Sequence, residues 1–268
     1  MLLHGSAVTY EVGNLLAATA AYRVYLARDV STSRYCLLQV AKSLGFNGGL
    51  DRAAFLLQRF KSSADVYDVE FSKTHARKHL HYDRLYPAIL ESFVSEEQGG
   101  RRINVLTLTD VDDVQRIVPL SNLRLKDALR IDPETSAWVL GRLLKLLTFV
   151  HGEGVQNRAI TARNVLLDPD QHFAITLDWS TARMFPGQVP KEFATQDIAG
   201  AASAVFAAIG GDVDRNVWLY EGHHRYVALL MQFMRGEVTC ADDAHDQFYK
   251  LVRAEYGQEF HPFTTLSL

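Results

Sequence analysis

The hydrophobic pattern changes near Asp110, and this change constrains the fold more than any other feature of the sequence. Before Asp110, apolar residues fall mostly in short alternating runs, as in β-strands; after it they mostly recur at helical spacing. A strand-rich segment followed by a helical one is typical of α+β proteins and not of repeated βαβ units. We therefore expect an α+β protein with two lobes, residues 1–109 and residues 110–268.

The first part contains two expected strand pairs and one expected helix. Residues 22–30 and 34–42 are rich in β-formers and are joined by Ser-Thr-Ser, which predicts a hairpin. Residues 86–94 and 102–110 have strand character on either side of a Gly-containing turn. Between these pairs, Asp51 has the features of an N-cap for a helix that starts with residues 52–60, and the polar stretch 61–86 is expected to be helical in part.

The second part is expected to be mainly helical. Asp132 followed by Pro133 and Glu134 is an N-cap, an N1 proline and a first-turn acid, which predicts a helix over 133–151. Residues 164–178 contain two short β-rich runs around a Pro-Asp-Gln turn, which predicts a small hairpin. Further helices are expected within 195–210, 223–236 and 242–257.

Composition excludes several classes of protein. The chain has 268 residues, 48% of them hydrophobic, and a net charge of −3, which indicates a globular protein with a sizeable core and predicts no nucleic-acid or membrane surface. The longest apolar stretch, residues 138–150, is interrupted by basic residues and is too short to cross a bilayer. The N-terminus lacks the pattern of a signal peptide. Only Cys36 and Cys240 are present, so we expect a reduced, cytoplasmic protein.

Several short motifs, taken in order, resemble the eukaryotic-type protein kinases from Tyr10 to about Gly257. "LLQVAK" resembles the strand that ends in the ATP-binding lysine, here Lys42. "VQNRAITARNVLLD" resembles the catalytic loop, and "ITLDWSTA" resembles the metal-binding segment that begins with an aspartate, here Asp178. "QDIAGAASAVF" resembles the core helix whose leading aspartate, here Asp197, holds the catalytic loop. Asp197 also has the features of the N-cap of that helix.

The resemblance implies a bilobal protein kinase-like fold with a β-rich N-lobe and a helical C-lobe. It also implies a site for ATP with Mg²⁺. Lys42 would contact the phosphates, whereas Asn164 and Asp178 would be metal ligands. Gln58 falls where the family's glutamate pairs with the lysine, and Thr19 falls in the glycine-rich phosphate loop.

Four departures from the family pattern point to lost catalysis. Ala159 occupies the position of the aspartate that orients the attacking hydroxyl, and its methyl group cannot accept a proton. The three phosphate-loop glycines are replaced by Ala17, Thr19 and Tyr22, which predicts a crowded or stiffened loop. Gln58 cannot neutralise a lysine, and the segment from Asp178 to Asp197 is too short for a complete activation loop.

The leading hypothesis is therefore a pseudokinase, a catalytically impaired kinase-like domain that acts as a protein-binding scaffold or allosteric regulator. Its expected partner is another protein, and its nucleotide site either binds ATP and Mg²⁺ weakly or does not bind them. One alternative is an atypical kinase-fold enzyme that transfers phosphate or AMP by a non-standard mechanism. A third hypothesis is a plain interaction module with an empty cleft.

Each candidate residue also has a simpler interpretation. A lysine at the end of a strand, such as Lys42, is often only solvated. Asn164 can cap a loop and Asp178 can end a strand at a turn. The basic stretch 73–84 has the pattern of a solvated helix face, although His75, His79 and Asp83 at helical spacing would also suit a metal, and the stretch as a whole an anionic partner.

Overall fold

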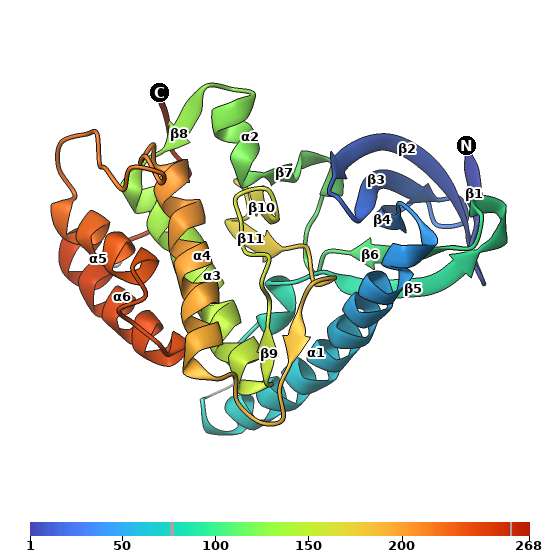
Figure 1. Ribbon diagram of the computed structural model, residues 1–268, viewed down its shortest axis with the longest axis horizontal. Coiled ribbons are helices and arrows are strands. Elements are labelled where there is room, and N and C mark those ends of the chain that lie inside the picture. Colours follow the sequence, from blue (N-terminus) through green and yellow to red (C-terminus); the bar gives the residue numbers. More distant parts are fainter. Residues whose placement is uncertain (76–77, 258) are drawn as a thin grey trace. The chain divides into compact units, whose positions relative to one another are not determined.

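The computed structural model describes residues 1–75, 78–257 and 259–268, and the chain divides into two compact units (Figure 1). The strand unit contains Met1–Ile117 and Trp179–Thr181, and the helical unit contains Val118–Asp178 and Ala182–Leu268. The division that the sequence pattern suggests lies at residues 109 and 110, whereas the two units meet in sequence at Ile117 and Val118. In the part of the chain described, no helix is both long and apolar enough to cross a membrane.

The strand unit is built on a six-stranded antiparallel sheet. In spatial order its strands are β1 (Leu2–His4), β2 (Thr9–Ala18), β3 (Tyr22–Asp29), β4 (Tyr35–Ala41), β6 (Arg101–Thr107) and β5 (Ala88–Ser95). Both expected strand pairs are confirmed: β3 pairs with β4, and β5 pairs with β6. The 3₁₀ helices of the unit are η1 (Leu44–Phe46), η2 (Tyr82–Arg84), η3 (Glu96–Gln98) and η4 (Val114–Arg116).

One long helix, α1 (Asn47–Thr74), packs on β5 and β6 of this sheet (Figure 1). The prediction that Asp51 caps this helix is wrong, because α1 begins at Asn47 and Asp51 lies inside it. The side chain of Asn47 fixes the start of the helix to the sheet: its Nδ2 donates to the carbonyl of Gly100 at 2.9 Å, and its Oδ1 accepts from the N–H of Arg102 at 2.8 Å. A tertiary contact therefore sets the start of α1.

The helical unit is arranged around α3 and α4. Its helices are α2 (Leu120–Leu125), α3 (Pro133–Gly152), α4 (Lys191–Ala208), α5 (His224–Met234) and α6 (Ala241–Tyr256). Its strands are short: β7 (Val118–Pro119), β8 (Leu129–Ile131), β9 (Val155–Gln156), β10 (Val165–Asp168), β11 (Phe173–Thr176), β12 (Arg183–Met184) and β13 (Thr265–Ser267). α3 packs against both α4 and α6, and Figure 1 shows α3 and α4 side by side.

The helix predicted over 133–151 is confirmed as α3, and so is its start. Asp132 Oδ1 accepts from the N–H of Thr135 at 2.6 Å, which satisfies one of the free N–H groups in the first turn. The predicted apolar stripe faces the core, where Leu140, Leu143 and Leu144 are fully buried. Full burial of one such side chain contributes roughly 1.5–3 kcal/mol, so α3 is a main source of stability in the unit.

The N-cap predicted at Asp197 is wrong. α4 begins at Lys191 after Pro190, so Asp197 lies within the helix and not at its start. The side chain of Asp197 is 2% exposed, and it points inward to the loop that follows α3. The small hairpin predicted within 164–178 is confirmed, with β10 and β11 paired antiparallel from Val165↔Thr176 to Asp168↔Phe173.

Candidate functional site

Asp197 anchors the loop between β9 and β10 in the helical unit. One carboxylate oxygen accepts from the N–H of Asn157 at 2.7 Å, and the other accepts from the N–H of Arg158 at 2.8 Å. His151 Nε2, at the end of α3, lies 3.1 Å from the same carboxylate. The resemblance implies that Asp197 holds this loop, and these bonds confirm that role.

The backbone of the loop is bent sharply at Arg158, whose φ is +67°. Left-handed conformations cost a non-glycine residue of the order of 1–3 kcal/mol and persist only where other contacts hold them. The bond from the N–H of Arg158 to Asp197 is such a contact. The loop is therefore held in a defined shape and is not merely a surface connection.

Asn157 is a positioning residue that the sequence analysis missed. Its side chain is fully buried, its Nδ2 donates to the carbonyl of Asp178 at 2.9 Å, and its Oδ1 accepts from the N–H of Ala159 at 2.8 Å. One side chain thus joins the loop to the end of the β10–β11 hairpin. The available signal was its place within the motif "VQNRAITARNVLLD", immediately before Arg158.

Ala159 sits at the centre of this framework and is 7% exposed. Its N–H is bonded to Asn157, and its carbonyl accepts from Nδ2 of Asn164 at 2.9 Å. The N–H and the carbonyl of Ala159 are thus both fixed, but its side chain is a methyl group, which cannot take or orient a proton. The loop therefore keeps an ordered backbone at a position that carries no general base.

Asn164 and Asp178 lie together at the open end of the hairpin. The carbonyl of Asn164 accepts from the N–H of Leu177 at 2.9 Å, which places Asp178 next to it across the ladder. With Nδ2 of Asn164 directed to Ala159, its Oδ1 is the amide atom available as a ligand, and Asp178 contributes a buried carboxylate. These two oxygen donors fit Mg²⁺, which usually takes few protein ligands together with phosphate and water.

A fuller protein cage for a metal is not found. Among the residues that the structure describes, no group of three or more His, Cys, Asp or Glu side chains is placed to hold an ion. The idea of a helical His75, His79 and Asp83 site is wrong, because α1 ends at Thr74 and Asp83 lies in η2. Arg77, which belongs to the same basic stretch, lies outside the described residues.

In the strand unit, Thr19 closes the turn between β2 and β3. Its hydroxyl oxygen accepts from the N–H groups of Ala21 and Tyr22, both at 3.1 Å, and its own N–H donates to the carbonyl of Tyr22 at 2.9 Å. The side chain of Tyr22 is 1% exposed, so it lies in the core of the unit. Three backbone N–H groups of the turn, those of Thr19, Ala21 and Tyr22, are therefore already bonded within it.

Lys42 follows β4 directly beside this turn, with its N–H donating to the carbonyl of Ala21 at 2.9 Å. Its side chain is exposed, as is that of Gln58 on α1. Within the described part of the strand unit, no hydrogen bond joins the Lys42 ammonium to the Gln58 amide. Lys42 and Thr19 are thus neighbours, whereas Gln58 is a surface residue of α1 that does not orient the lysine.

The residues after Asp178 are fixed to α1 within the strand unit. Trp179 is fully buried and packs edge-on against Phe60, with ring centroids 4.9 Å apart. The carbonyl of Ser180 accepts from Arg52 Nη1 at 3.1 Å, and a side chain on Gly49 would lie 3.2 Å from the same carbonyl. Trp179 therefore fills the core, as its apolar ring suggests.

The segment that leads into α4 is short and tied to the helical unit. β12 pairs with β9, and the guanidinium of Arg183 lies over the rings of Phe185 and Phe193, at 4.9 and 4.7 Å from their centroids. The N–H of Phe185 also donates to the carbonyl of Gly154 at 2.8 Å. These contacts favour one compact path for the segment.

Comparison with solved structures identifies the fold. The chain is similar to the structure of vaccinia related kinase 3, with a TM-score of 0.63 over 95% of this chain and 90% of that chain, at 13% sequence identity. It is also similar to the BubR1 kinase domain, with a TM-score of 0.62 over 96% of this chain and 84% of that chain, at 12% identity. The fold is protein kinase-like. No protein-family model and no curated protein sequence matches the chain.

The two units match the two lobes of the kinase-like fold. The strand unit corresponds to a β-rich N-terminal lobe and the helical unit to a helical C-terminal lobe, as the resemblance implies. At identities of 12–13% the similarity concerns the fold alone, and activity depends on the residues at the site.

Proposed function

We propose that this protein is a pseudokinase, a catalytically impaired kinase-like domain that works as a protein-binding scaffold or allosteric regulator. The observation that carries the proposal is Ala159. Its peptide is held on both sides by Asn157 and Asn164, yet the position offers no carboxylate to orient an attacking hydroxyl. Loss of a group that positions or moves a proton lowers a rate by typically 10²–10⁴-fold.

The turn closed by Thr19 supports the proposal from the strand unit. Phosphate-binding loops present free backbone N–H groups to the ligand. Here the N–H groups of Thr19, Ala21 and Tyr22 are already bonded within the turn. A nucleotide would have to displace those bonds, so Lys42, Asn164 and Asp178 would provide most of the attraction for ATP and Mg²⁺, and binding is weak.

A protein partner is supported by the exposed side of α1. Val66 and Val69 lie one turn apart near the end of α1 and are 61% and 56% exposed, and Phe55, three turns earlier on the same face, is 54% exposed. Exposed apolar side chains on one helix face can be covered by another protein.

The decisive experiment is transfer of the radiolabelled γ-phosphate of ATP to generic protein substrates, with Mg²⁺ or Mn²⁺. We expect no transfer above background from the wild-type protein. Robust transfer that disappears in Asp178→Ala would overturn the proposal and favour an atypical kinase-fold enzyme.

Calorimetric titration with ATP tests the nucleotide part. We expect weak binding that requires Mg²⁺ and is reduced in both Lys42→Met and Asp178→Ala. Binding that is equal without metal and in both variants would contradict the assignment of these residues. Absence of any heat would leave a scaffold without nucleotide and refute this part of the proposal.

A further inference from the structure

Residues 259–268, which we call the strap, lie across β8 and the start of α3 in the helical unit. Within the strap, β13 pairs antiparallel with β8, and β8 pairs with no other strand among those described. The N–H of Thr264 donates to Thr135 Oγ1 at 2.9 Å, and the N–H of Asp132 donates to the carbonyl of Thr264 at 3.2 Å. The strap takes no part in the loop around Ala159, so the functions discussed above do not account for it.

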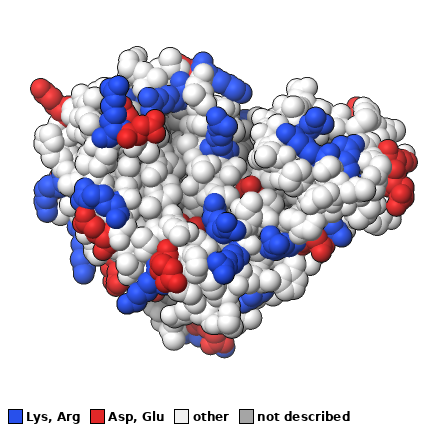
Figure 2. All heavy atoms as spheres, in the orientation of Figure 1, with Lys and Arg blue, Asp and Glu red and all other residues white. Residues whose placement is uncertain are grey.

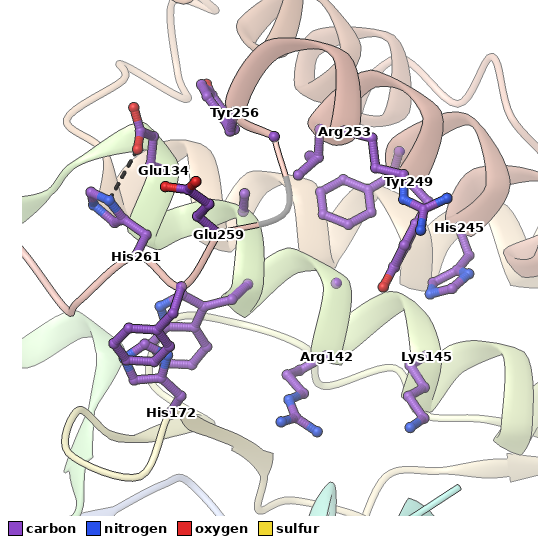
Figure 3. A pocket seen from close by; sticks show the side chains of 17 residues that line it. Glu134, Arg142, Lys145, His172, His245, Tyr249, Arg253, Tyr256, Glu259 and His261 are labelled. Atoms are coloured by element: carbon purple, nitrogen blue, oxygen red, sulfur yellow. Dashed lines mark ion pairs between the residues drawn. The ribbon is translucent and has the colours of Figure 1, made fainter. Parts of the chain in front are cut away.

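His261 joins the strap to the first turn of α3 through both nitrogens of its ring. Nε2 lies 3.0 Å from Asp132 Oδ2, and Nδ1 lies 3.0 Å from Glu134 Oε2, the contact drawn in Figure 3. A carboxylate only accepts hydrogen bonds, so each ring nitrogen needs a hydrogen to make its bond, and an imidazole carries both hydrogens only when it is protonated. The first turn of a helix favours negative charge, so both acids are well placed as partners of a cation. The complete contact therefore requires the imidazolium form of His261.

Aromatic rings hold the strap on either side of His261. Phe260 is stacked on His172 with ring centroids 4.7 Å apart, and His172 is stacked in turn on Trp138 at 4.8 Å. Phe263 packs against Trp138 with centroids 6.2 Å apart. The first three of these aromatic residues also line a cavity between α3 and α6. Because Phe260 is 77% exposed, its burial contributes little, and the bonds of His261 are a substantial part of what holds the strap.

The other ionisable groups near His261 differ from it in how they respond to pH. Burial lowers the pKa of His172 in the β10–β11 turn, and Arg142 and His261 lower it further. A proton on His172 would repel the charge of His261, so titration of His172 would loosen the strap at low pH. Burial raises the pKa of the Tyr256 hydroxyl in α6, and nearby acids raise it further, so this group stays neutral at pH 8. Glu259, another acid of the strap, lines the same cavity.

We propose that the strap is a pH-sensitive closure of the helical unit, tight when the His261 imidazolium bridges Asp132 and Glu134 and looser when it loses its proton. Neutral imidazole has one N–H, so it keeps only one of the two bonds, and the two carboxylates then face a ring without charge. Histidine changes charge between about pH 5 and 8, so the closed strap is stabilised at the acid end of that range and loosened as pH rises through it. Opening frees the edge of β8 and the ring of Trp138, and an unpaired strand edge is a template for another chain.

Hydrogen exchange of the full chain at pH 6 and pH 8 tests the proposal, with rates corrected for the intrinsic effect of pH. The probes are the N–H groups of Asp132, Thr264 and Leu268, all of which are bonded across the contact of the strap with β8 and α3. We expect their protection to fall about two- to fivefold from pH 6 to pH 8, the size expected for loss of a partly exposed ion pair, while the amides of α4 do not change. Protection that is equal at both pH values, or that rises with pH, overturns the proposal. A parallel fall in α4 would indicate opening of the whole unit and refute a local strap.

Variants assign the effect to His261. His261→Gln keeps an N–H donor without a charge, so protection of the strap should be low at both pH values and independent of pH. Glu134→Gln removes one of the two carboxylates and should reduce the pH dependence; its side chain is 40% exposed, so this variant keeps the test valid if His261→Gln fails to fold. His224→Gln is the matched control, because His224 is an exposed histidine at the start of α5, and the pH dependence should remain as in wild type. A pH dependence that survives in His261→Gln, or that disappears in His224→Gln, refutes the assignment.

Discussion

Asp197→Ala is the substitution that tests most directly how the loop around Ala159 is held. Asp197 is almost completely buried and accepts backbone bonds from Asn157 and Arg158 as well as contacting His151. Its removal leaves the buried N–H of Asn157 and the partly buried N–H of Arg158 without their acceptor, and an unsatisfied buried group costs about 1–3 kcal/mol. Arg158 also loses the bond that holds its left-handed conformation. We expect the free energy of unfolding to fall by about 3–5 kcal/mol, a large share of the roughly 5–15 kcal/mol that is typical of a domain.

Urea denaturation followed by circular dichroism measures this loss. With a slope of about 2 kcal/mol per molar urea, the midpoint should fall by about 2 M. Asp197→Asn keeps one carbonyl oxygen and should lose less. Asp246→Ala, at an exposed position of α6, should change the free energy of unfolding by no more than about 0.5 kcal/mol. If Asp197→Ala remains within about 1 kcal/mol of wild type, Asp197 is not the anchor of the loop.

Three further predictions concern other parts of the chain. Burial raises the pKa of the Cys36 thiol to about 12, so at pH 8 only about 10⁻⁴ of it is thiolate. In a Cys240→Ser variant, which removes the other free thiol, labelling with a thiol reagent should be very slow until the protein unfolds, and rapid labelling of the native variant would contradict this. Gly154→Ala should lower the midpoint of thermal unfolding by several degrees, because the φ of Gly154 is +73° and a methyl group there would collide with the carbonyls of Gly187 and Phe185. An unchanged midpoint would refute this close contact. Hydrogen bonds from the β3–β4 turn lower the pKa of Asp29 to about 2. The ionised Asp29 therefore stabilises the folded protein fully above pH 4, and this contribution is lost as pH falls from 4 to 2. Asp29→Asn should flatten the pH dependence of the free energy of unfolding in that range, and an unchanged profile would contradict this.

Elements with strong local signals could be predicted from the sequence. The β3–β4 hairpin and α3 follow from period-two and helical patterns with clear turn and cap residues, and the structure has both. The N-caps assigned to Asp51 and Asp197 were wrong for a common reason. An aspartate before an apolar run is a local signal, whereas contacts from distant residues set where α1 begins and draw Asp197 inward.

The candidate site was only partly predictable for the same reason. Lys42, Asn164, Asp178 and Ala159 could be chosen by their places in motifs, but no motif shows that the β2–β3 turn bonds its own N–H groups. Gln58 was chosen by its place in the sequence, but its exposure depends on the rotation of α1 about its axis relative to the sheet. The cavity between α3 and α6 left no local signal, because its lining residues come from segments far apart in the chain.

On the face shown in Figure 2, Lys and Arg side chains are interspersed with Asp and Glu side chains.

The loop around Ala159 has a fixed backbone although the side chain at its centre is a methyl group. The buried carboxylate of Asp197, the buried amide of Asn157 and the left-handed conformation of Arg158 all fix its backbone. Each is costly in a loop that only connects two strands, because desolvation of Asp197 and strain at Arg158 must be offset by bonds nearby. In a kinase-like site such costs position a catalytic group, but here they position a methyl group. They are explained if the protein uses the shape of the loop itself, which joins Asp178 to α4 through Asn157, and this supports the proposed scaffold or allosteric regulator.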